Sequence, residues 1–340
     1  MDFSLFPQAR YKGCKRRLLP FLHSCLAMYE TDDVLDLYSG SGIVSLMFRQ
    51  MGKRVHSNDF LKSCSITARA LLGYDGHSET PASLGRNLRY LLEFDSCGSE
   101  RLIGHHFDGI YFTAEENHQL DLLCQKKQLL NPRIADLYLH LVAQACLKKR
   151  PYNLFDRPDL ETRLRDIKRA SRNHVTWEAG IIKHAEKALL ELNKLTMAVP
   201  AEHRVTTKDA CELDHFDPHA GLVYIDPPSL SSKGIAFDYA NGYHFLEGLS
   251  DYSLFAQADH SKPHRPIIQK SSLWSTPEGA KSAISDIADH FQSGVIAISH
   301  RTDSAISTAE VVARLDRPGR RVLVNNHNNE EDLLITSEPS

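Results

Sequence analysis

Residues 34–42 (VLDLYSGSG) constrain the fold of this chain most strongly, because they join a buried strand to a helix through two closely spaced glycines. The apolar start of this segment predicts a strand, its Ser-Gly-Ser-Gly end a tight turn, and residues 43–51 the helix that follows. Residues 53–57 predict a second short strand, which ends at Asn58 and Asp59. A strand–helix–strand start is typical of a parallel, doubly wound sheet. We therefore predict an α/β fold with a doubly wound, mostly parallel, Rossmann-like sheet.

The middle of the chain has a different texture from its two ends. From about residue 75 to 195 the sequence is polar, with helical patterns and no strand signal strong enough for a sheet core. We expect helices near residues 16–30, 115–129, 134–148, 159–171, 177–195 and 277–291, and further strands at residues 221–226, 295–299, 321–325 and 332–336. The sheet is then assembled from both ends of the chain. The predicted organisation is a catalytic domain of residues 1–75 and 196–340, interrupted by an inserted helical region of residues 76–195.

Composition excludes several classes of protein. The chain has 340 residues, of which 42% are hydrophobic and 24% charged, as expected for a globular protein with a full core. The formal net charge of −3 excludes a uniformly basic nucleic-acid binder but not a local basic face. No uninterrupted apolar run is long enough to predict a membrane span. The seven cysteines form no Cys-x-x-Cys pair, so we predict neither a disulfide framework nor a zinc site, and a reducing, cytoplasmic setting.

The glycine turn points to a nucleoside ligand. Glycines at a strand end allow a sharp turn and a close approach of a ligand to the backbone. Asp59 follows Gly42 by 17 residues, at the end of the next strand, where a carboxylate can accept hydrogen bonds from ribose hydroxyls. A lone Gly-x-Gly turn also occurs for purely structural reasons. Because the third glycine of a dinucleotide motif is missing, the pattern favours a mononucleoside such as S-adenosylmethionine.

A second motif, Asp226-Pro227-Pro228-Ser229, follows the predicted strand at residues 221–226. Neither proline can donate to a strand ladder, so the pair ends the strand and holds Asp226 at the carboxyl edge of the sheet. The amine of adenine is a poor nucleophile because its lone pair is delocalised into the ring. Asp226 and the Pro227 carbonyl could accept its two N–H bonds and localise that lone pair for in-line attack on a methyl sulfonium. No metal is required, because the leaving group is a neutral thioether.

With these motifs in view, the sequence resembles the adenine-N6 DNA methyltransferases of the DNA adenine methylase group. The resemblance rests on segments that occur in the family's order between residue 10 and about 310. Beyond the glycine turn and Asp-Pro-Pro, they are Arg10-Tyr11-Lys12-Gly13-Cys14-Lys15, Asn58-Asp59, Tyr111-Phe112-Thr113 with Asn117 and Asp121, Asp209-Ala210, residues 243–249 (YHFLEGL) and residues 299–304 (SHRTDS).

The resemblance implies S-adenosylmethionine as cofactor and a sequence-specific site in double-stranded DNA as substrate, with adenine flipped out of the duplex. The implied catalytic residues are Asp226, Pro227, Pro228 and Ser229. The implied cofactor-binding residues are Tyr11, Lys15, Asp36, Tyr38, Ser39, Gly40, Ser41, Gly42, Asn58, Asp59, Asp209, Ala210 and Asp226. The basic cluster between residues 148 and 172 would face DNA, through Lys148, Lys149, Arg150, Arg165, Lys168 and Arg169. A companion restriction endonuclease or defence subunit is a further expected partner.

The chain departs from the family pattern at the fourth position of the catalytic tetrad. Ser229 stands where an aromatic residue normally stacks on the flipped base, and Phe237, Tyr239 or Tyr243 could supply a substitute face. His300 also stands where tyrosine is usual. Two alternatives to an active adenine-N6 DNA methyltransferase remain: a catalytically weakened or inactive subunit of a modification or defence system that binds DNA or cofactor, and an RNA methyltransferase. The RNA enzymes with a similar tetrad need a cysteine nucleophile, and Cys211 lies in no suitable motif. The assignment requires that Asp226 face the nucleoside pocket rather than pack inside against a lysine.

Overall fold

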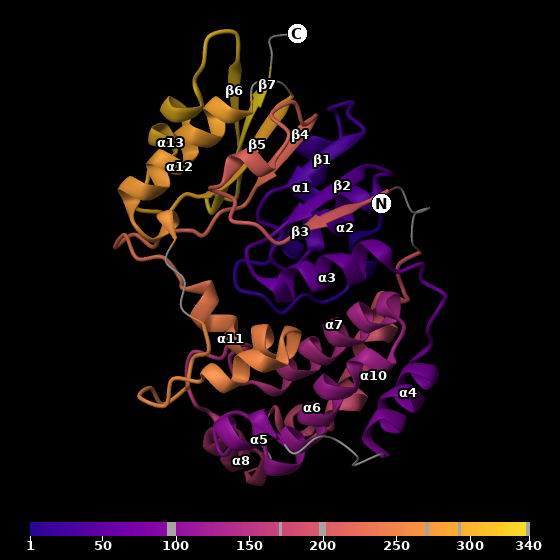
Figure 1. Cartoon of the computed structure of the whole chain (residues 1–340). Coiled ribbons are helices and arrows are strands. Elements are labelled where there is room, and N and C mark those ends of the chain that lie inside the picture. The colour runs from indigo at the N-terminus through magenta and orange to yellow at the C-terminus, as the bar shows by residue number, and fades with distance from the viewer. Residues whose placement is uncertain (94–99, 170–171, 197–201, 269–271, 292–293, 338–340) are drawn as a thin grey trace.

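A seven-stranded sheet in the order β3-β2-β1-β4-β5-β7-β6 forms the centre of the computed structural model, which describes residues 1–93, 100–169, 172–196, 202–268, 272–291 and 294–337 (Figure 1). The strands are β1 (Asp33–Asp36), β2 (Arg54–Asn58), β3 (Arg204–Thr206), β4 (Leu222–Ile225), β5 (Val295–Arg301), β6 (Arg321–His327) and β7 (Glu331–Ser337). The first five strands of this list pair in parallel, whereas β7 runs antiparallel to both β5 and β6. The prediction of a mostly parallel α/β sheet is confirmed.

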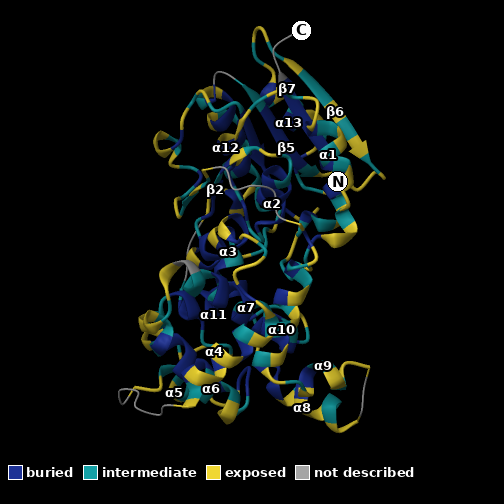
Figure 2. Ribbon diagram, turned by 90° about the vertical axis from the view of Figure 1, so that its right-hand side faces the viewer, coloured by how far each residue is buried: buried dark blue, intermediate teal, exposed yellow. Residues whose placement is uncertain are grey.

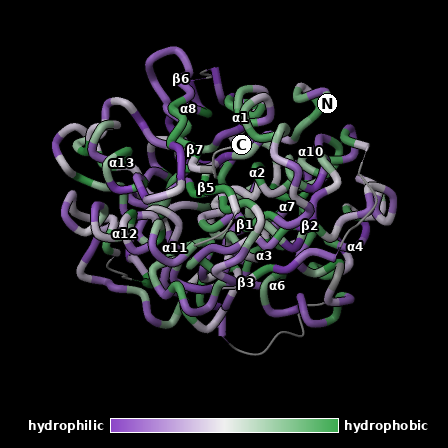
Figure 3. The backbone as a smooth tube through the Cα atoms, turned by 90° about the horizontal axis from the view of Figure 1, so that it is seen from above, coloured by the Kyte–Doolittle hydropathy of each residue, from purple (hydrophilic) through white to green (hydrophobic). Residues whose placement is uncertain are grey.

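Helices cover both faces of this sheet. Successive side chains of a strand point to opposite faces, and here both sets are apolar and must be buried. On one face, Val34 and Leu222 pack with the helices α1 (Leu19–Leu26), α2 (Ile43–Gln50) and α3 (Lys62–Gly73). On the other face, Leu35 and Val223 pack with α12 (Pro277–His290) and α13 (Thr308–Leu315). Seen from above, α12 and α13 lie on one side of the strands and α1 and α2 on the other (Figure 3). Burial on both faces explains why β4 is apolar throughout.

A second, helical body lies below the sheet in Figure 1. Its helices are α4 (Pro81–Glu93), α5 (Leu102–Phe107), α6 (Ala114–Lys126), α7 (Pro132–Lys149), α8 (Leu160–Lys168), α9 (His174–Glu178), α10 (Ile181–Leu192) and α11 (Tyr239–Ser250). The short helices α8 and α9 project from this body (Figure 2). Six 3-10 helices also occur within the described residues: η1 (Phe3–Leu5), η2 (Lys15–Leu18), η3 (Lys127–Leu129), η4 (Leu213–His215), η5 (Tyr252–Gln257) and η6 (Leu273–Ser275).

The helical body differs from the expected insertion in one respect. Helix α11 follows the Asp-Pro-Pro segment in sequence but packs against α3, α6 and α7. Its buried side chains, among them Tyr243 and Phe245, join the same core as those of α7. The predicted helix at residues 177–195 is split into α9 and α10, because Ala179 and Gly180 are extended between them. Among the described residues, no helix combines the length and apolarity needed to cross a membrane.

Candidate active site

A cavity of about 1350 Å³ opens at the carboxyl ends of β1, β4 and β5, where ligands of open α/β sheets are bound. Most of the residues predicted to form the site line this one cavity. They are Tyr11, Lys15, Asp36, Tyr38, Ser39, Gly40, Ser41, Asp59, Asp226, Pro227, Pro228 and Ser229. The volume exceeds the range of about 300–1,000 Å³ that is usual for small-molecule sites, which leaves room for two ligands side by side.

The glycine turn is held in a conformation that suits a close ligand. Gly40 and Gly42 both have positive φ angles, of 47° and 69°. A Cβ atom on Gly40 would lie 3.0 Å from Cε1 of Tyr11, so the ring of Tyr11 packs directly on the turn. Oδ2 of Asp59 accepts a hydrogen bond of 2.8 Å from the Gly40 N–H, and its Oδ1 accepts one of 2.9 Å from the Leu61 N–H. Asp59 therefore fixes the turn as well as facing the cavity.

Two polar atoms in this part of the cavity are buried without a partner among the described residues. Oδ2 of Asp36 accepts a hydrogen bond of 2.6 Å from Oγ of Ser45, but its Oδ1 has no partner, and neither has Oγ of Ser39. Burial raises the pKa of Asp36 to about 7 and that of Asp59 to about 6. Orphaned polar atoms in a cavity indicate a ligand with complementary groups. The ammonium, carboxylate and hydroxyl groups of S-adenosylmethionine meet that requirement.

Asp226 is in contact with a lysine of the N-terminal motif. Nζ of Lys15 lies 2.8 Å from Oδ1 of Asp226 and 3.1 Å from Oε1 of Glu331, which also accepts a hydrogen bond of 2.5 Å from Oγ of Ser299. Burial raises the pKa of Asp226 to about 6, against the opposing effect of the Lys15 charge. The Asp226 side chain nevertheless remains 23% exposed and lines the cavity. The carboxylate thus faces the cavity and pairs with a lysine at once, although these two arrangements were expected to exclude each other.

A stack of tyrosine rings attaches the N-terminal motif to α11. The ring centroids of Tyr11 and Tyr243 lie 4.5 Å apart at an interplanar angle of 7°, and those of Tyr11 and Tyr239 lie 5.5 Å apart. The backbone N–H of Lys12 donates a hydrogen bond of 2.7 Å to the Tyr243 hydroxyl. Further along α11, the Glu247 carboxylate accepts hydrogen bonds from the first N–H groups of α3. The segment at residues 243–249 therefore positions the cavity wall and the start of α3.

Four predicted cofactor residues do not line the cavity. Gly42 begins α2, and a Cβ atom there would lie 3.1 Å from a Leu71 methyl group. Asn58 is fully buried and joins three strands, since its side chain bonds to Leu37, Thr206 and Lys208. Asp209 accepts a hydrogen bond from the Cys211 N–H, and Ala210 is buried in the core beneath α12. The described contacts of these residues support the sheet and its loops.

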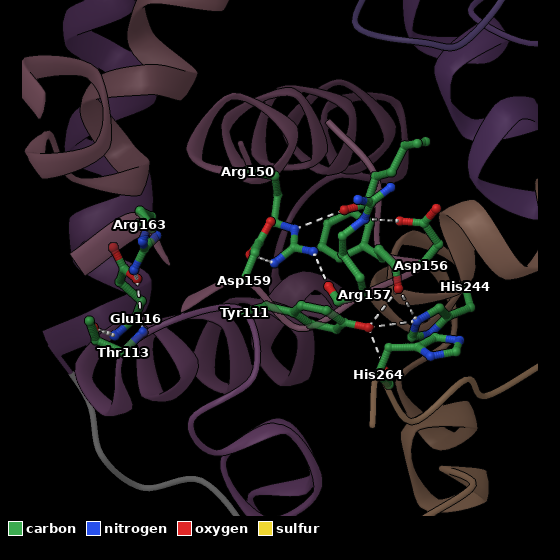
Figure 4. Close-up of polar contacts among 12 residues, drawn as sticks. Tyr111, Thr113, Glu116, Arg150, Asp156, Arg157, Asp159, Arg163, His244 and His264 are labelled. Carbon is green, nitrogen blue, oxygen red and sulfur yellow. Dashed lines mark hydrogen bonds and ion pairs between the residues drawn. The ribbon is translucent and has the colours of Figure 1, made fainter. Parts of the chain in front are cut away.

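Lys149 and Arg150, two of the residues expected to face DNA, are instead buried. Figure 4 shows Arg150 with Asp159 and the ring of Tyr111. Nζ of Lys149 lies 2.8 Å from Oε1 of Glu116 and donates to the carbonyl oxygens of Trp177 and Ala179. Arg150 pairs with Asp159 and packs its guanidinium over the ring of Tyr111. Because a buried, paired cation cannot reach a phosphate, the prediction is wrong for these two residues.

A buried cluster of charged residues connects the projecting helices to the helical body. Its members are Glu116, Lys149, Arg150, Asp159 and Arg163. Arg163 of α8 lies 2.5 Å from Oε2 of Glu116, the same carboxylate that Lys149 contacts. Glu116 in turn completes a capping box with Thr113 at the start of α6. The remaining predicted DNA-binding side chains are accessible: Arg165, Lys168 and Arg169 are exposed, and Lys148 is partly exposed.

Several cavity residues were not predicted from the sequence. Glu331 belongs to β7, nearly at the end of the chain, and no local motif marks it. Trp274 lines the cavity near residue 38, where its Nε1 donates a hydrogen bond of 2.7 Å to the Tyr38 hydroxyl. A tryptophan just before a predicted helix was the only available signal for this contact. Both residues reach the cavity through tertiary folding alone.

Comparison with known families identifies most of the chain that forms this site. A family model described as D12 class N6 adenine-specific DNA methyltransferase matches residues 11–264, well over half of the chain. No curated protein sequence matches the chain. The matched range includes the N-terminal motif, the glycine turn, Asp-Pro-Pro and α11, but not β5 or β7. It favours neither of the two alternatives, the weakened subunit and the RNA methyltransferase.

Proposed function

Since this chain belongs to the D12 class of N6 adenine-specific DNA methyltransferases, we propose that its cavity binds S-adenosylmethionine beside a flipped adenine. The enzyme methylates the N6 amine of adenine in DNA, and methyltransferases of this kind draw the methyl group from S-adenosylmethionine. The observation that carries the proposal is the shared cavity of Asp226 and the glycine turn. A carboxylate that can hold the amine next to a turn that can hold the methyl donor brings the two reacting groups close together, which favours transfer between them.

In this proposal Asp226 and Pro227 prepare the adenine amine. Bound S-adenosylmethionine supplies an electrophilic methyl group. Lys15 holds Oδ1 of Asp226, while no residue of the described chain bonds to Oδ2, so that oxygen can accept one amine hydrogen. The Pro227 carbonyl accepts the other. Because prolines have no N–H, the backbone at Pro227 and Pro228 presents acceptors only, which suits an amine donor.

The cofactor is assigned to the residues around the turn. Asp36 and Ser39 offer the orphaned polar atoms, and Asp59 has further lone pairs for a hydroxyl group although both its oxygens already accept from the backbone. Tyr38, whose hydroxyl is fixed by Trp274, gives the cavity an aromatic wall. Tyr11 completes the site on the side of the N-terminal motif.

We assign DNA binding to the accessible basic residues alone. Arg165, Lys168 and Arg169 are exposed on the projecting helices, where they can reach phosphates. Lys148 belongs to a second basic group near the N-terminal motif. Its pKa is lowered by burial and by the nearby charges of Arg10 and Lys187. Like charges gathered on one surface favour a polyanionic partner.

The direct test is expression of wild-type and Asp226→Ala chains in a host that lacks DNA methylation, followed by long-read sequencing. We expect N6-methyladenine in one sequence context for the wild type and none for Asp226→Ala. Calorimetry should show that the variant still binds S-adenosylmethionine. Asp214→Ala, which removes an exposed carboxylate outside the cavity, is the matched control. Methylation by Asp226→Ala would refute the assigned role.

A further inference from the structure

A short hairpin follows the catalytic tetrad directly. Leu230 and Ala236 form an antiparallel bridge. The turn between them is closed by hydrogen bonds from the Ser231 N–H to the Ile235 carbonyl and from the Gly234 N–H to the Ser231 carbonyl, both 2.9 Å. In antiparallel pairing, the residue before one partner lies opposite the residue after the other. The register therefore sets Phe237 across from Ser229, the position at which the family has its aromatic residue.

The ring of Phe237 is held in place where it meets the cavity. It packs on Gly242 so closely that a Cβ atom there would lie 2.4 Å from Cζ of the ring. Nζ of Lys12 lies 4.0 Å from the ring centroid, over one face. The side chain is partly exposed and lines the same cavity as Asp226 and Ser229. A ring that is already fixed loses little conformational freedom when a ligand stacks on it.

The other aromatic residues of this region are engaged with one another. Tyr11 and Tyr243 are parallel at 4.5 Å, and Tyr243 is only 1% exposed. Tyr239 stacks on Tyr11 and donates a hydrogen bond of 3.3 Å to the Lys12 carbonyl. The ring of Phe237 is nearly perpendicular to those of Tyr239 and Tyr243, at 88° and 74°, and within the described chain no ring is stacked parallel to it.

We propose that Phe237 supplies the ring on which the flipped target adenine stacks, in place of an aromatic side chain at position 229. This inference rests on the proposed function, since it assumes that the cavity receives a flipped adenine. Lys12 covers one face of the ring, and the purine takes the other. The small side chain of Ser229 leaves the space across the hairpin into which the base enters. Phe237 thereby takes over the stacking role of position 229, which lies directly across the hairpin from it.

The test compares variants of Phe237 that change the ring, the bulk or both. Phe237→Leu keeps apolar bulk against Gly242 without an aromatic face, and Phe237→Ala removes both. Each should lower kcat/KM by about 5- to 150-fold, the range expected when a base–aromatic stack is removed. Phe237→Tyr should stay close to the wild type. Calorimetric binding of S-adenosylmethionine should be unchanged in all three. Tyr90→Ala, which truncates an exposed aromatic residue of α4, is the control that should keep full activity.

A rescue experiment separates stacking from a merely structural role. Adding Ser229→Tyr to Phe237→Ala places a ring on the opposite strand of the hairpin, and we expect it to restore most of the missing activity. A second readout uses a duplex in which 2-aminopurine replaces the methylated adenine. Stacking on Phe237 should quench the fluorescence of the flipped base, and Phe237→Leu should release that quenching.

The possible results separate failure of the role proposed for Phe237 from failure of the proposed adenine methylation. Wild-type kcat/KM and unchanged quenching in Phe237→Leu would overturn the role of Phe237 while leaving methylation by Asp226 intact. Loss of activity that Ser229→Tyr does not recover, with quenching retained, would assign Phe237 to folding of the hairpin and would also overturn the inference. Absence of N6-methyladenine with the wild-type enzyme would refute the proposed function, and the inference with it.

Discussion

Nζ of Lys15 lies between the carboxylates of Asp226 and Glu331, 2.8 Å from the first and 3.1 Å from the second. One buried cation thus links the N-terminal motif, the catalytic tetrad and the last strand of the sheet. Asp226 accepts a hydrogen bond from the adenine amine more strongly when it is ionised. Its pKa is raised to about 6 by burial, lowered by Lys15 and raised by Glu331. The two neighbours therefore act on the catalytic group with opposite signs.

Removal of the lysine charge should make the enzyme more sensitive to acid. In the proposed mechanism the active form of Asp226 is the carboxylate, so the rate should fall as pH drops through its pKa, about 6. Lys15→Met removes the charge that lowers this pKa. The acid limb of the kcat profile should then move to higher pH, which a pH series of methyl transfer would show. An unchanged limb would mean that a group other than Asp226 controls it.

Neutralising Glu331, the other carboxylate that contacts Lys15, should shift the pKa of Asp226 in the opposite direction. Glu331→Gln removes a negative charge that raises the pKa of Asp226 and leaves Lys15 with one carboxylate partner. We expect the acid limb to move to lower pH. Glu278→Gln is the control, because this exposed carboxylate lies outside both the cavity and the ion-paired group. Shifts of the same sign for Lys15→Met and Glu331→Gln would contradict the arrangement.

Cofactor binding should release protons near neutral pH. Burial raises the pKa of Asp36 to about 7 and that of Asp59 to about 6, so both carboxyl groups are partly protonated below those values. S-adenosylmethionine is cationic and favours their ionised forms. Its affinity should fall by roughly tenfold per pH unit for each proton that must leave, once the pH is below the pKa values. Calorimetry in buffers of different ionisation enthalpy would measure the released protons. A pH-independent affinity would place the cationic groups elsewhere.

The sequence was sufficient to predict those features that depend on neighbouring residues. The strand, glycine turn and helix at residues 34–51 follow from local pattern, and the structure has β1, the turn and α2 there. Asp226 at the carboxyl end of β4 follows from the two prolines behind it. Its link to Glu331 through Lys15 does not follow from the sequence, because β7 reaches the cavity only through its antiparallel pairing with β5. Contacts that depend on the pairing of strands far apart in the sequence leave no pattern in the neighbouring residues.

Charge was the least reliable guide, because a run of basic residues does not reveal which side chains are buried. Lys149 at the end of α7 and Arg150 directly after it are buried, whereas Arg165 of α8 and Arg169 directly after that helix are exposed. The acidic partners of the first two are Glu116 of α6 and Asp159 at the start of α8, and no local pattern marks either pairing. Which basic side chains are buried therefore depends on ion pairs formed in the folded chain.

Two groups of basic residues should therefore differ in their effect on DNA binding. Replacing Arg165, Lys168 and Arg169 together with glutamine should reduce the slope of log affinity against log salt by about 0.9 for each phosphate that is no longer neutralised. Binding titrations on duplex DNA at several salt concentrations would measure it. Lys53→Gln with Arg54→Gln, at the amino end of β2 and away from the cavity, should leave the slope unchanged. Equal slopes for both sets would exclude α8 from the DNA surface.

The buried cluster should instead control stability. Glu116→Gln removes the carboxylate that Lys149 and Arg163 share, and leaves both buried cations without an ion-pair partner among the described residues. Breaking a buried ion pair costs about 3–5 kcal/mol. Urea denaturation should show a loss of unfolding free energy in that range, or early unfolding of the helical body. Glu115→Gln, a more exposed neighbour in the same turn, should have little effect. Equal stability of the two variants would contradict the structural role.

The limits of the family match and of the catalytic centre do not coincide. A fragment cut after residue 264 would retain every segment of the match, from the N-terminal motif to α11. It would lack β5 and β7, and with them Glu331 and the strand that covers the outer edge of β4. Such a fragment would expose an apolar strand edge prone to aggregation. The shortest active enzyme therefore has to be delimited by the sheet rather than by its motifs.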